Sequence, residues 1–409
     1  MPLRLNVRMA FNFFTDDGTN YEVQNMLGAV RTGCGDAGEI LATVATITDG
    51  DATSWVSAWQ ATADRVAKIA DDALAAGHHV SARDAYLRAA SYYAAVLPLV
   101  DGVADADKVL HAAFVEHRRC FDAYISQLDV PGEKVDIPYE GSTMPGYFFA
   151  ASTDGTPRRT IILNNGSDGA VTTMFPGFGW GAVERGYHVL VFDGPGQQSM
   201  LFDHKVPFRA DWEQVITPVV DFLRARPDVD DDRIAIYGIS QAGYWVPRAL
   251  AFEHRLAGAV VDPGVIDVST SWLGHLPESM VPMLHDKDKK TFDEFMDIGN
   301  AASTDPMAAQ LMAWRGKPYG ITDPYDLFTA VMGYTLDDLP KQITTPMLVT
   351  DPEGEQFWPG QSQRLYDALP GPKELVKFTA AEGADRHCEP MARSLVEQRI
   401  LDWLDTTMP

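Results

Sequence analysis

The sequence has few cysteines and no long apolar run. Cys34, Cys120 and Cys388 lie far apart and form no C-x-x-C pair, so we expect neither a disulfide framework nor a zinc motif. No stretch approaches the roughly 18 apolar residues that span a membrane, and no apolar run follows Arg4 and Arg8 as it would in a signal peptide. These absences predict a soluble, cytoplasmic protein without a metal centre.

The sequence also has fewer basic than acidic residues. The chain has 33 Lys and Arg against 57 Asp and Glu, which gives a formal net charge of -24. A surface this acidic disfavours nucleic acid and anionic membranes as partners. The apolar content of 46% and charged content of 22% predict a large folded core. A chain of 409 residues has room for one large domain with insertions, or for two domains.

Apolar residues recur at helical spacing through residues 1–130, which predicts an N-terminal helical block. The spacing is clearest over Val56, Trp59, Ala63, Val66, Ile69 and Leu74, and again over Tyr86, Leu87, Ala90, Tyr93 and Val96. We expect Ser81 to cap the second of these helices, and a third to run from about Asp105 to Leu128. A helical block before any strand is either a separate domain or a cap on the domain that the later strands form.

From about Pro131 the apolar period changes to 2, and strand and helix signals then alternate. This pattern predicts a parallel sheet with helices on both faces. A hairpin is expected at Lys134–Tyr139 and Gly146–Ala151. Further strands are expected at Thr160–Asn164, His188–Asp193, Ile234–Tyr237, Ala257–Val261, Pro346–Thr350 and Glu374–Phe378, with helices at 172–185, 212–225, 361–369 and 391–404. Residues 131–264 and 343–409 would form this core, and the Met- and Trp-rich segment 265–342 would be a helical insertion.

Gly238-Ile239-Ser240-Gln241-Ala242-Gly243 stands between a predicted strand and a predicted helix. A serine at the apex of such a turn is a candidate nucleophile, and the sharp turn needs small residues two before and two after it. Gly238 and Ala242 meet this need, although the usual motif has glycine where Ala242 stands. The Gln241 backbone N–H could face a developing oxyanion.

A serine nucleophile needs a histidine base and a carboxylate that orients the base. His387 lies between the last predicted strand and the last helix, where this architecture places its histidine, whereas His254 and His285 fall on a helix or in the insertion and are interpreted as ordinary. Two acids compete in the loop after Met347–Thr350. Glu355 lies four residues before Pro359, which precedes the next predicted helix, and Asp351 lies at the strand tip.

The loop after Thr160–Asn164 contains Gly166 and Gly169, which allow close backbone approach. Ser167 or Asp168 is therefore a candidate second oxyanion donor, unless the loop is an ordinary turn. Several aromatic residues fall near predicted loops and the insertion, where they could line an apolar pocket or simply belong to the core: Trp180, Tyr244, Trp245, Trp272, Trp314, Phe357 and Trp358.

The elbow, the late His387 and the strand end Phe192-Asp193-Gly194-Pro195-Gly196-Gln197 resemble the α/β-hydrolase family. The helical stretch Gly77–Ala89 is similar to that of a subgroup with an N-terminal helical cap, which includes 2,6-dihydroxypseudooxynicotine hydrolase and the polyketide chain-shortening hydrolases of melanin pathways. The resemblance implies the α/β-hydrolase fold, a Ser–acid–His hydrolase without a metal or cofactor, and often a homodimer. Gln198 and Glu355 depart from the family pattern, where Gly and Asp are commoner.

We therefore expect a serine-type hydrolase that cleaves an ester, or a C–C bond beside a ketone, in a bulky apolar polyketide-like or aromatic small molecule. Residues 1–130 and 265–342 would act as cap and lid. The alternative keeps the fold without hydrolysis, as an isomerase, a cyclase or a ligand-binding protein of a biosynthetic pathway. An oligopeptidase is disfavoured because no propeller repeat is present.

Overall fold

The computed structural model describes residues 12–302 and 306–409, and they divide into two compact units. One unit comprises the residues up to Pro131 together with the segment that ends at Arg315. The other comprises Gly132–Ala302 and Gly316–Pro409. Within the described residues, no helix is both long enough and apolar enough to cross a membrane.

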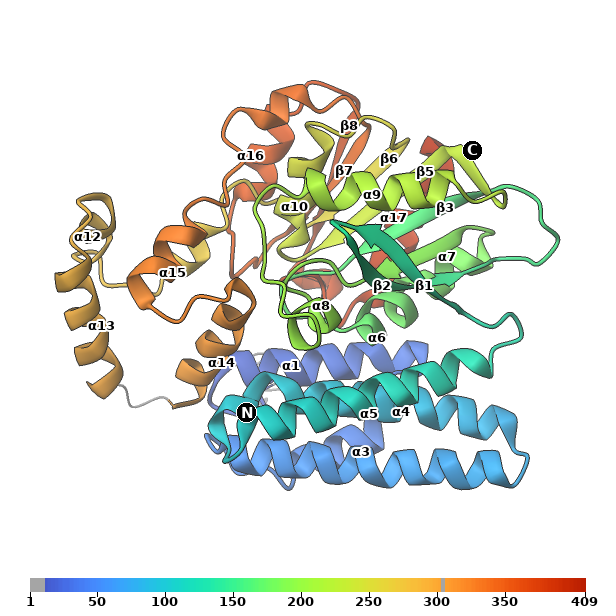
Figure 1. Cartoon of the computed structure of the whole chain (residues 1–409), viewed down its shortest axis with the longest axis horizontal. Helices are drawn as coiled ribbons and strands as arrows, with labels where there is room; N and C mark the ends of the chain where they lie inside the picture. The colour runs from blue at the N-terminus through green and yellow to red at the C-terminus, as the bar shows by residue number, and fades with distance from the viewer. Residues whose placement is uncertain (1–11, 303–305) are drawn as a thin grey trace, which may run out of the picture. The chain divides into compact units, whose positions relative to one another are not determined.

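The first unit is helical, as predicted (Figure 1). Its helices are α1 (Asp17–Gly28), α2 (Ala37–Val44), α3 (Ala52–Ala75), α4 (His79–Val96) and α5 (Ala106–Ser126), joined by α14 (Pro306–Gly316) from the later segment. Its core is aromatic: the Trp59 ring packs between Trp55 and Tyr92 at centroid distances of 5.8 and 5.7 Å. Of these three rings, Trp59 lies in the apolar stripe predicted on α3, whereas Trp55 and Tyr92 lie outside the predicted stripes. Ile69, predicted as part of the α3 stripe, is exposed.

Aspartate side chains cap the first three helices of this unit. Asp16, Asp36 and Asp51 accept hydrogen bonds from first-turn backbone N–H groups of α1, α2 and α3. The expectation for Ser81 was wrong, because α4 begins at His79 after the left-handed Gly77 and its N-cap, His78, makes no side-chain cap bond. The turn at Gly77 therefore starts the helix two residues before the serine.

The second unit is built on one eight-stranded sheet with the order β1-β2-β4-β3-β5-β6-β7-β8. β1–β2 is an antiparallel hairpin, β2 pairs antiparallel with β4, and every later pair is parallel. The predicted, mostly parallel sheet is thus confirmed. Its strands are β1 (Glu133–Tyr139), β2 (Ser142–Phe149), β3 (Arg158–Asn164), β4 (His188–Phe192), β5 (Val229–Ile239), β6 (Gly258–Asp262), β7 (Met347–Pro352) and β8 (Lys373–Phe378).

Helices cover both faces of this sheet, which is why β4 and β6 are buried along their whole length (Figure 1). α9 (Glu213–Arg224), α10 (Ala242–Leu250) and α16 (Gln361–Ala368) pack on one face, and α7 (Trp180–Glu184) and α17 (Arg393–Thr407) on the other. The short α8 (Gln198–Phe202) follows β4. Because the register pairs Asn164 with Gly238 and Ile239 with Asp262, β3, β5 and β6 end together at one edge.

The single helix expected at 172–185 is broken into three parts. α6 (Val171–Met174) and α7 are joined by a π-helical turn over Phe175–Gly179. Pro176 has no N–H to donate and Gly177 and Gly179 weaken helix, so a regular α-helix does not continue through this stretch.

The segment between β6 and β7 is helical, as predicted for the insertion, and contributes to both units. α11 (Ser269–Leu273), α12 (Val281–His285), α13 (Lys289–Ala302) and α15 (Pro324–Val331) belong to the sheet unit, whereas α14 packs with the N-terminal helices. A Cβ on Gly102 would lie 2.6 Å from the Gln310 side chain, which shows how tightly α14 is held there.

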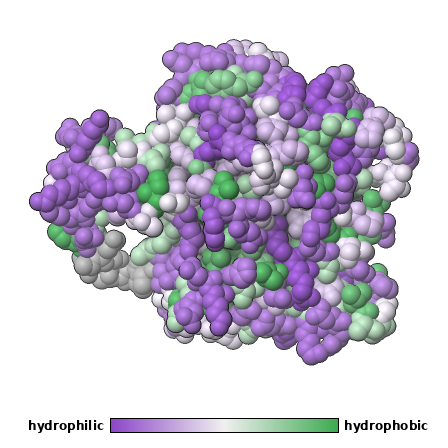
Figure 2. Space-filling view, viewed as in Figure 1, coloured by the Kyte–Doolittle hydropathy of each residue, from purple (hydrophilic) through white to green (hydrophobic). Residues whose placement is uncertain are grey.

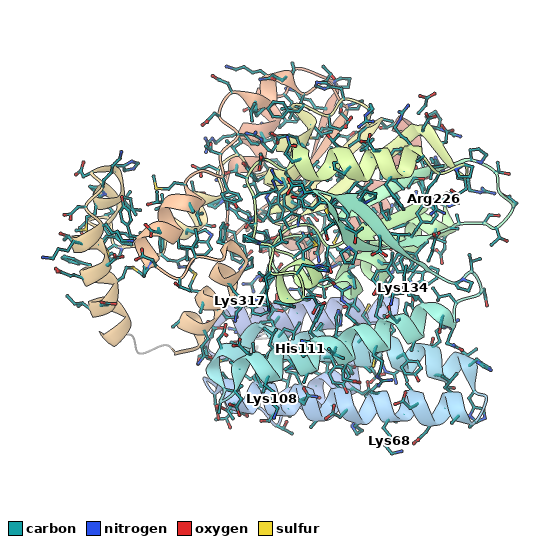
Figure 3. The ribbon with its side chains drawn as sticks, viewed as in Figure 1. Lys68, Lys108, His111, Lys134, Arg226 and Lys317 are labelled. Atoms are coloured by element: carbon teal, nitrogen blue, oxygen red, sulfur yellow. The ribbon has the colours of Figure 1, made fainter. Side chains whose placement is uncertain are left out.

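The surface carries charge in keeping with the composition. Most of the face shown in Figure 2 is hydrophilic, and its apolar residues form small separate patches. Some arginines connect elements of the fold: Arg226, labelled in Figure 3, lies over the Phe148 ring at 3.8 Å and pairs with Glu133 and Asp228. It thereby joins the chain before β5 to the β1–β2 hairpin.

Candidate active site

Ser240 lies at the sharp turn between β5 and α10, in the left-handed region at φ 57°. This conformation is unfavourable for a residue with a Cβ, costing about 1–2 kcal/mol, and must be held by its surroundings. The Ser240 N–H donates to the carbonyl of Asp262 at 2.6 Å, which ties the turn to the end of β6. The side chain of Ser240 therefore projects from a fixed backbone.

Two glycines let the helix pack this closely behind Ser240. A Cβ on Gly238 would lie 2.6 Å from the Val246 side chain and 2.8 Å from the Ala242 carbonyl. A Cβ on Gly243 would lie 1.9 Å from the Pro263 carbonyl. Ala242 is tolerated at the position where the usual motif has glycine, and it is Gly243 that meets the neighbouring strand end.

His387 reaches Ser240 from the loop after β8. Its Nε2 lies 2.9 Å from Ser240 Oγ, and its Nδ1 lies 2.8 and 3.0 Å from the two carboxylate oxygens of Glu355. The His387 backbone N–H also donates to Gln356 Oε1 at 2.8 Å. Two loops at the same edge of the sheet thus hold the imidazole at both ring nitrogens and at the backbone.

The Glu355 carboxylate is buried but well supplied with donors. Burial by itself raises its pKa, but the His387 ring and the backbone N–H groups of Phe357 and Trp358 outweigh burial and hold the pKa below its usual value. Glu355 is therefore charged near neutral pH and favours the imidazole tautomer with its proton on Nδ1.

Asp351, the alternative acid, does not contact His387. Its side chain is 20% exposed and pairs with Lys377 at 3.8 Å. Burial raises its pKa, and Lys377 opposes this rise. Of the two acids left open by the sequence, the structure brings only Glu355 to the histidine.

The loop after β3 approaches Ser240 closely at Gly166. A Cβ on Gly166 would lie 2.7 Å from Ser240 Cβ and 3.3 Å from its Oγ, so only glycine fits there. Ser167 and Asp168 come directly after it, and the Ser167 hydroxyl donates to the Asp168 carboxylate at 3.0 Å. Across from this loop, the Gln241 backbone N–H donates to no group in the described part of the chain.

The buried Gln197 holds this loop in place, a role that sequence reasoning missed. Its Nε2 donates to the carbonyls of Asn165 and Gly166 at 2.7 and 3.0 Å, and its Oε1 accepts from the Gly194 N–H at 2.8 Å. The signal was present, because Gln197 ends the Asp-Gly-Pro-Gly-Gln run, but its partners lie on another strand end.

The aromatic candidates fall into separate groups. The Trp245 ring stacks on Trp212 at 4.2 Å, Tyr244 contacts Tyr334, and Trp272 meets Tyr319 edge-on at 5.5 Å. The rings of Phe357 and Trp358 lie 4.7 and 5.6 Å from the His387 ring. Trp180 of α7 packs against Phe175, and Trp314 belongs to the helical unit. Of these aromatic residues, Phe357 and Trp358 therefore have rings that lie against His387.

A buried acidic cluster behind the site was also missed. Asp262 and Glu389 are both fully buried, and Asp262 accepts from the Tyr237 and Thr350 hydroxyls at 2.8 and 2.7 Å. Its carbonyl accepts from Cys388 Sγ at 3.2 Å as well as from Ser240. Burial and the neighbouring Asp262 raise the pKa of Glu389 well above its usual value. Asp262 thus links the turn at Ser240 to the loop that carries His387.

No group of three or more His, Cys, Asp or Glu side chains in residues 12–302 and 306–409 is arranged to hold a metal ion. The reactive groups that the structure brings together are the hydroxyl of Ser240, the imidazole of His387 and the carboxylate of Glu355. A hydroxyl, an imidazole and a carboxylate hydrogen-bonded in this order are the groups that acyl transfer to a serine uses.

Comparison with known proteins agrees with this fold. No protein-family model matches the sequence. Hydrolase LUC6 of a Fusarium species is 30% identical, with 95% of this chain and 96% of that protein covered. The 20-hydroxy-prefusarin hydrolase FUS2 of Gibberella moniliformis is 28% identical, covering 96% and 97%. The alpha/beta hydrolase pydG of an Acremonium species is 31% identical over 70% of each chain.

The crystal structure of 2,6-dihydroxy-pseudo-oxynicotine hydrolase superimposes with a TM-score of 0.67, at 19% identity, over 93% of this chain and 95% of that one. This likeness supports the fold, and the resemblance seen in the sequence is confirmed. Together with the relatives at 30% identity or above, it establishes that the chain is a hydrolase and belongs to the α/β-hydrolase family.

Proposed function

We propose that the protein is a serine-type hydrolase whose nucleophile is Ser240. The observation that carries the proposal is the unbroken hydrogen-bonded series from Ser240 Oγ to His387 Nε2 at 2.9 Å and from His387 Nδ1 to Glu355 at 2.8 Å. A serine hydroxyl becomes nucleophilic when a positioned imidazole accepts its proton, and the carboxylate stabilises the imidazolium that forms. Asp351 has no part in this series.

The reaction has two halves. Ser240 Oγ attacks the substrate carbonyl while His387 takes its proton, and collapse of the tetrahedral intermediate breaks the bond to the leaving group, which receives that proton from His387. Water, deprotonated by His387, then releases the acyl group from Ser240 as a carboxylic acid. The Gln241 N–H, together with the N–H of Ser167 or Asp168, would hold the oxyanion in both halves. The contact of Gly166 with Ser240 supports this assignment.

The substrate we propose is a bulky, apolar, oxygenated small molecule. Rings of Phe357 and Trp358 beside His387, and the aromatic cluster around Tyr319, offer apolar surface near the nucleophile. A relative named for 20-hydroxy-prefusarin supports an oxygenated natural product. The bond cleaved is an ester, or a C–C bond beside a ketone, where delocalisation into the ketone makes the carbanion a feasible leaving group.

A fluorophosphonate probe tests the nucleophile. We expect one adduct, mapped by peptide mass spectrometry to Ser240, and no adduct in Ser240→Ala. Ser57→Ala, on an exposed part of α3, is the matched control and should label normally. An adduct on another residue, or full hydrolysis by Ser240→Ala in a mass-spectrometric screen of acyl esters and β-diketones, would reject the proposal. Isomerised or cyclised products in that screen would favour the non-hydrolytic alternative.

A further inference from the structure

The side-chain amide of Gln241 is buried beside the nucleophile and has a donor group without an acceptor. Gln241 is 3% exposed, and its Nε2 has no hydrogen-bond partner in the described part of the chain. Leaving a buried amide donor unsatisfied costs about 1–3 kcal/mol. Such groups in folded proteins call for an explanation, and a ligand that completes the hydrogen bond is one.

The other end of the same amide is anchored. The Tyr319 hydroxyl donates to Gln241 Oε1 at 3.5 Å. Because the oxygen and nitrogen of an amide lie on opposite sides of its carbon, fixing the oxygen toward Tyr319 turns the NH₂ group away from it. The unpartnered donor therefore points away from Tyr319.

Tyr319 is itself held rigidly. It ends the 3₁₀ turn Lys317–Tyr319, which begins at the Lys317 labelled in Figure 3. The Pro318 carbonyl accepts from the Phe208 N–H at 2.8 Å. The Tyr319 ring meets Phe208 and Trp272 edge-on, at centroid distances of 5.2 and 5.5 Å. Burial raises the pKa of Tyr319, so its hydroxyl keeps its proton and remains a donor.

The position in the chain sets what the donor can reach. Gln241 is the residue directly after Ser240, and its backbone N–H is one of the proposed oxyanion donors. A substrate carbonyl under attack by Ser240 Oγ would lie against that N–H, and we infer that the side-chain NH₂ group of the same residue meets an oxygen a few atoms away on the substrate. A second carbonyl in a 1,3 relation to the first has this spacing.

We propose that the Gln241 side chain binds the second oxygen of a 1,3-dicarbonyl substrate, and that Tyr319 is the positioning residue that orients it. The inference rests on the proposed function and makes its substrate class specific. In C–C cleavage the electron pair of the broken bond passes to the α-carbon and delocalises onto this second oxygen as an enolate. Gln241 donates a hydrogen bond to the enolate oxygen without losing its proton, and His387 returns the Ser240 proton to the α-carbon.

Two esters that differ by one oxygen test the inference. Ethyl benzoylacetate has a ketone in the 1,3 position, and ethyl hydrocinnamate has a methylene there. We expect Gln241→Met to lower the ratio of kcat/KM for the first over the second by about ten- to a hundredfold, the effect of losing one hydrogen bond to a polar substrate group. Tyr319→Phe should lower the ratio less, because the amide remains but loses its anchor. Gln363→Met, an exposed glutamine on α16, should leave it unchanged.

Binding provides a readout that does not need turnover. In the Ser240→Ala background, calorimetric titration with benzoylacetone should give an affinity about tenfold weaker or more when Gln241→Met is added. A ratio and an affinity both within threefold of the parent protein would overturn the inference, as would loss of Ser240 labelling in Gln241→Met, which would mean that the side chain supports the turn instead. Failure of Ser240 labelling in the unmodified protein rejects the proposed function separately.

Discussion

The backbone N–H of Ser240 and the backbone carbonyl of Asp262 form a hydrogen bond of 2.6 Å between the ends of neighbouring strands. Three residues further along the same two segments, the Val265 N–H donates a second hydrogen bond to the Gly243 carbonyl at 3.2 Å. The strained conformation of Ser240 is thus stabilised from β6 and the residues after it, and changes in either segment should alter the position of Ser240.

Gly243→Ala should therefore destabilise the protein and lower its activity. The added methyl would overlap the Pro263 carbonyl, at 1.9 Å, and overpacking of a rigid backbone contact costs about 1–3 kcal/mol or more. Thermal unfolding measures the loss. Gly299→Ala on α13, where a Cβ meets nothing within 4 Å, is the control and should be neutral or slightly stabilising. Equal melting temperatures for both variants would contradict the steric account.

Exchange of the two acids separates their roles. Glu355→Gln should lower kcat by about 10⁴, because the neutral amide no longer stabilises the imidazolium or selects the productive tautomer. Asp351→Asn should remain near the parent rate, since its partner is Lys377 and not His387. Steady-state kinetics on any ester that the protein hydrolyses decides this, and a crippled Asp351→Asn with an active Glu355→Gln would reverse the assignment.

Gln197→Met should lower kcat with little change in KM. The variant keeps the side-chain volume but loses three hydrogen bonds that hold Asn165, Gly166 and Gly194. On the proposed mechanism, the loop after β3 would then be less well placed to stabilise the transition state, and we expect kcat to fall by about ten- to a hundredfold. The rate of fluorophosphonate labelling should fall in parallel. A larger effect on KM than on kcat would show that the loop serves ground-state binding.

Glu389→Gln should become more stable relative to the parent protein as pH rises. The folded-state pKa of Glu389 is raised by burial and by Asp262, with Glu355 adding to the rise and Arg393 opposing it. A raised pKa means that the parent protein is most stable below the ordinary carboxyl pKa and loses stability as pH rises through the folded pKa. The glutamine side chain does not ionise, so the variant does not lose stability in this way as pH rises.

The difference in unfolding free energy between Glu389→Gln and the parent should therefore grow above about pH 4.5, by up to about 1.4 kcal/mol per pH unit. Urea denaturation of both proteins at about pH 5, 7 and 9 measures this difference, because the isosteric pair shares every other titrating group. A difference that stays constant with pH would show that Glu389 does not titrate differently on folding.

The parts of the site that could be proposed from the sequence are those with local signals. Ser240 is marked by a strand, a small-residue turn and a helix, and His387 by its place after the last strand. Glu355 needed only a count back from Pro359. The alternation of strands and helices was enough for the parallel sheet because each element carries its own period.

The remaining features depend on contacts between distant segments. Nothing near Asp262 or Glu389 in the sequence indicates that the two are buried together, and Gln197 finds its partners on another strand end. The contact of Tyr319 with Gln241 joins positions in different elements, and no periodic pattern predicts it. The break at Pro176 was not predicted, and the start of α4 was expected at Ser81 instead of His79. In both places a local turn interrupts a segment whose apolar spacing is helical.

The packing of α14 has a consequence for how such a protein can change over generations. Met307 and Leu311 of this helix are buried, and Leu311 lies where a Cβ on Gly18 would be 2.6 Å away. The chain first forms the helices of the N-terminal unit, then strands β1 to β6 of the sheet, and then contributes α14 to the N-terminal unit before β7 and β8. Truncation or fusion of the gene at the N-terminal boundary would leave an apolar helix in the middle of the remaining chain without its packing partners. We therefore expect the unit and the insertion between β6 and β7 to vary together rather than to be exchanged as separate modules.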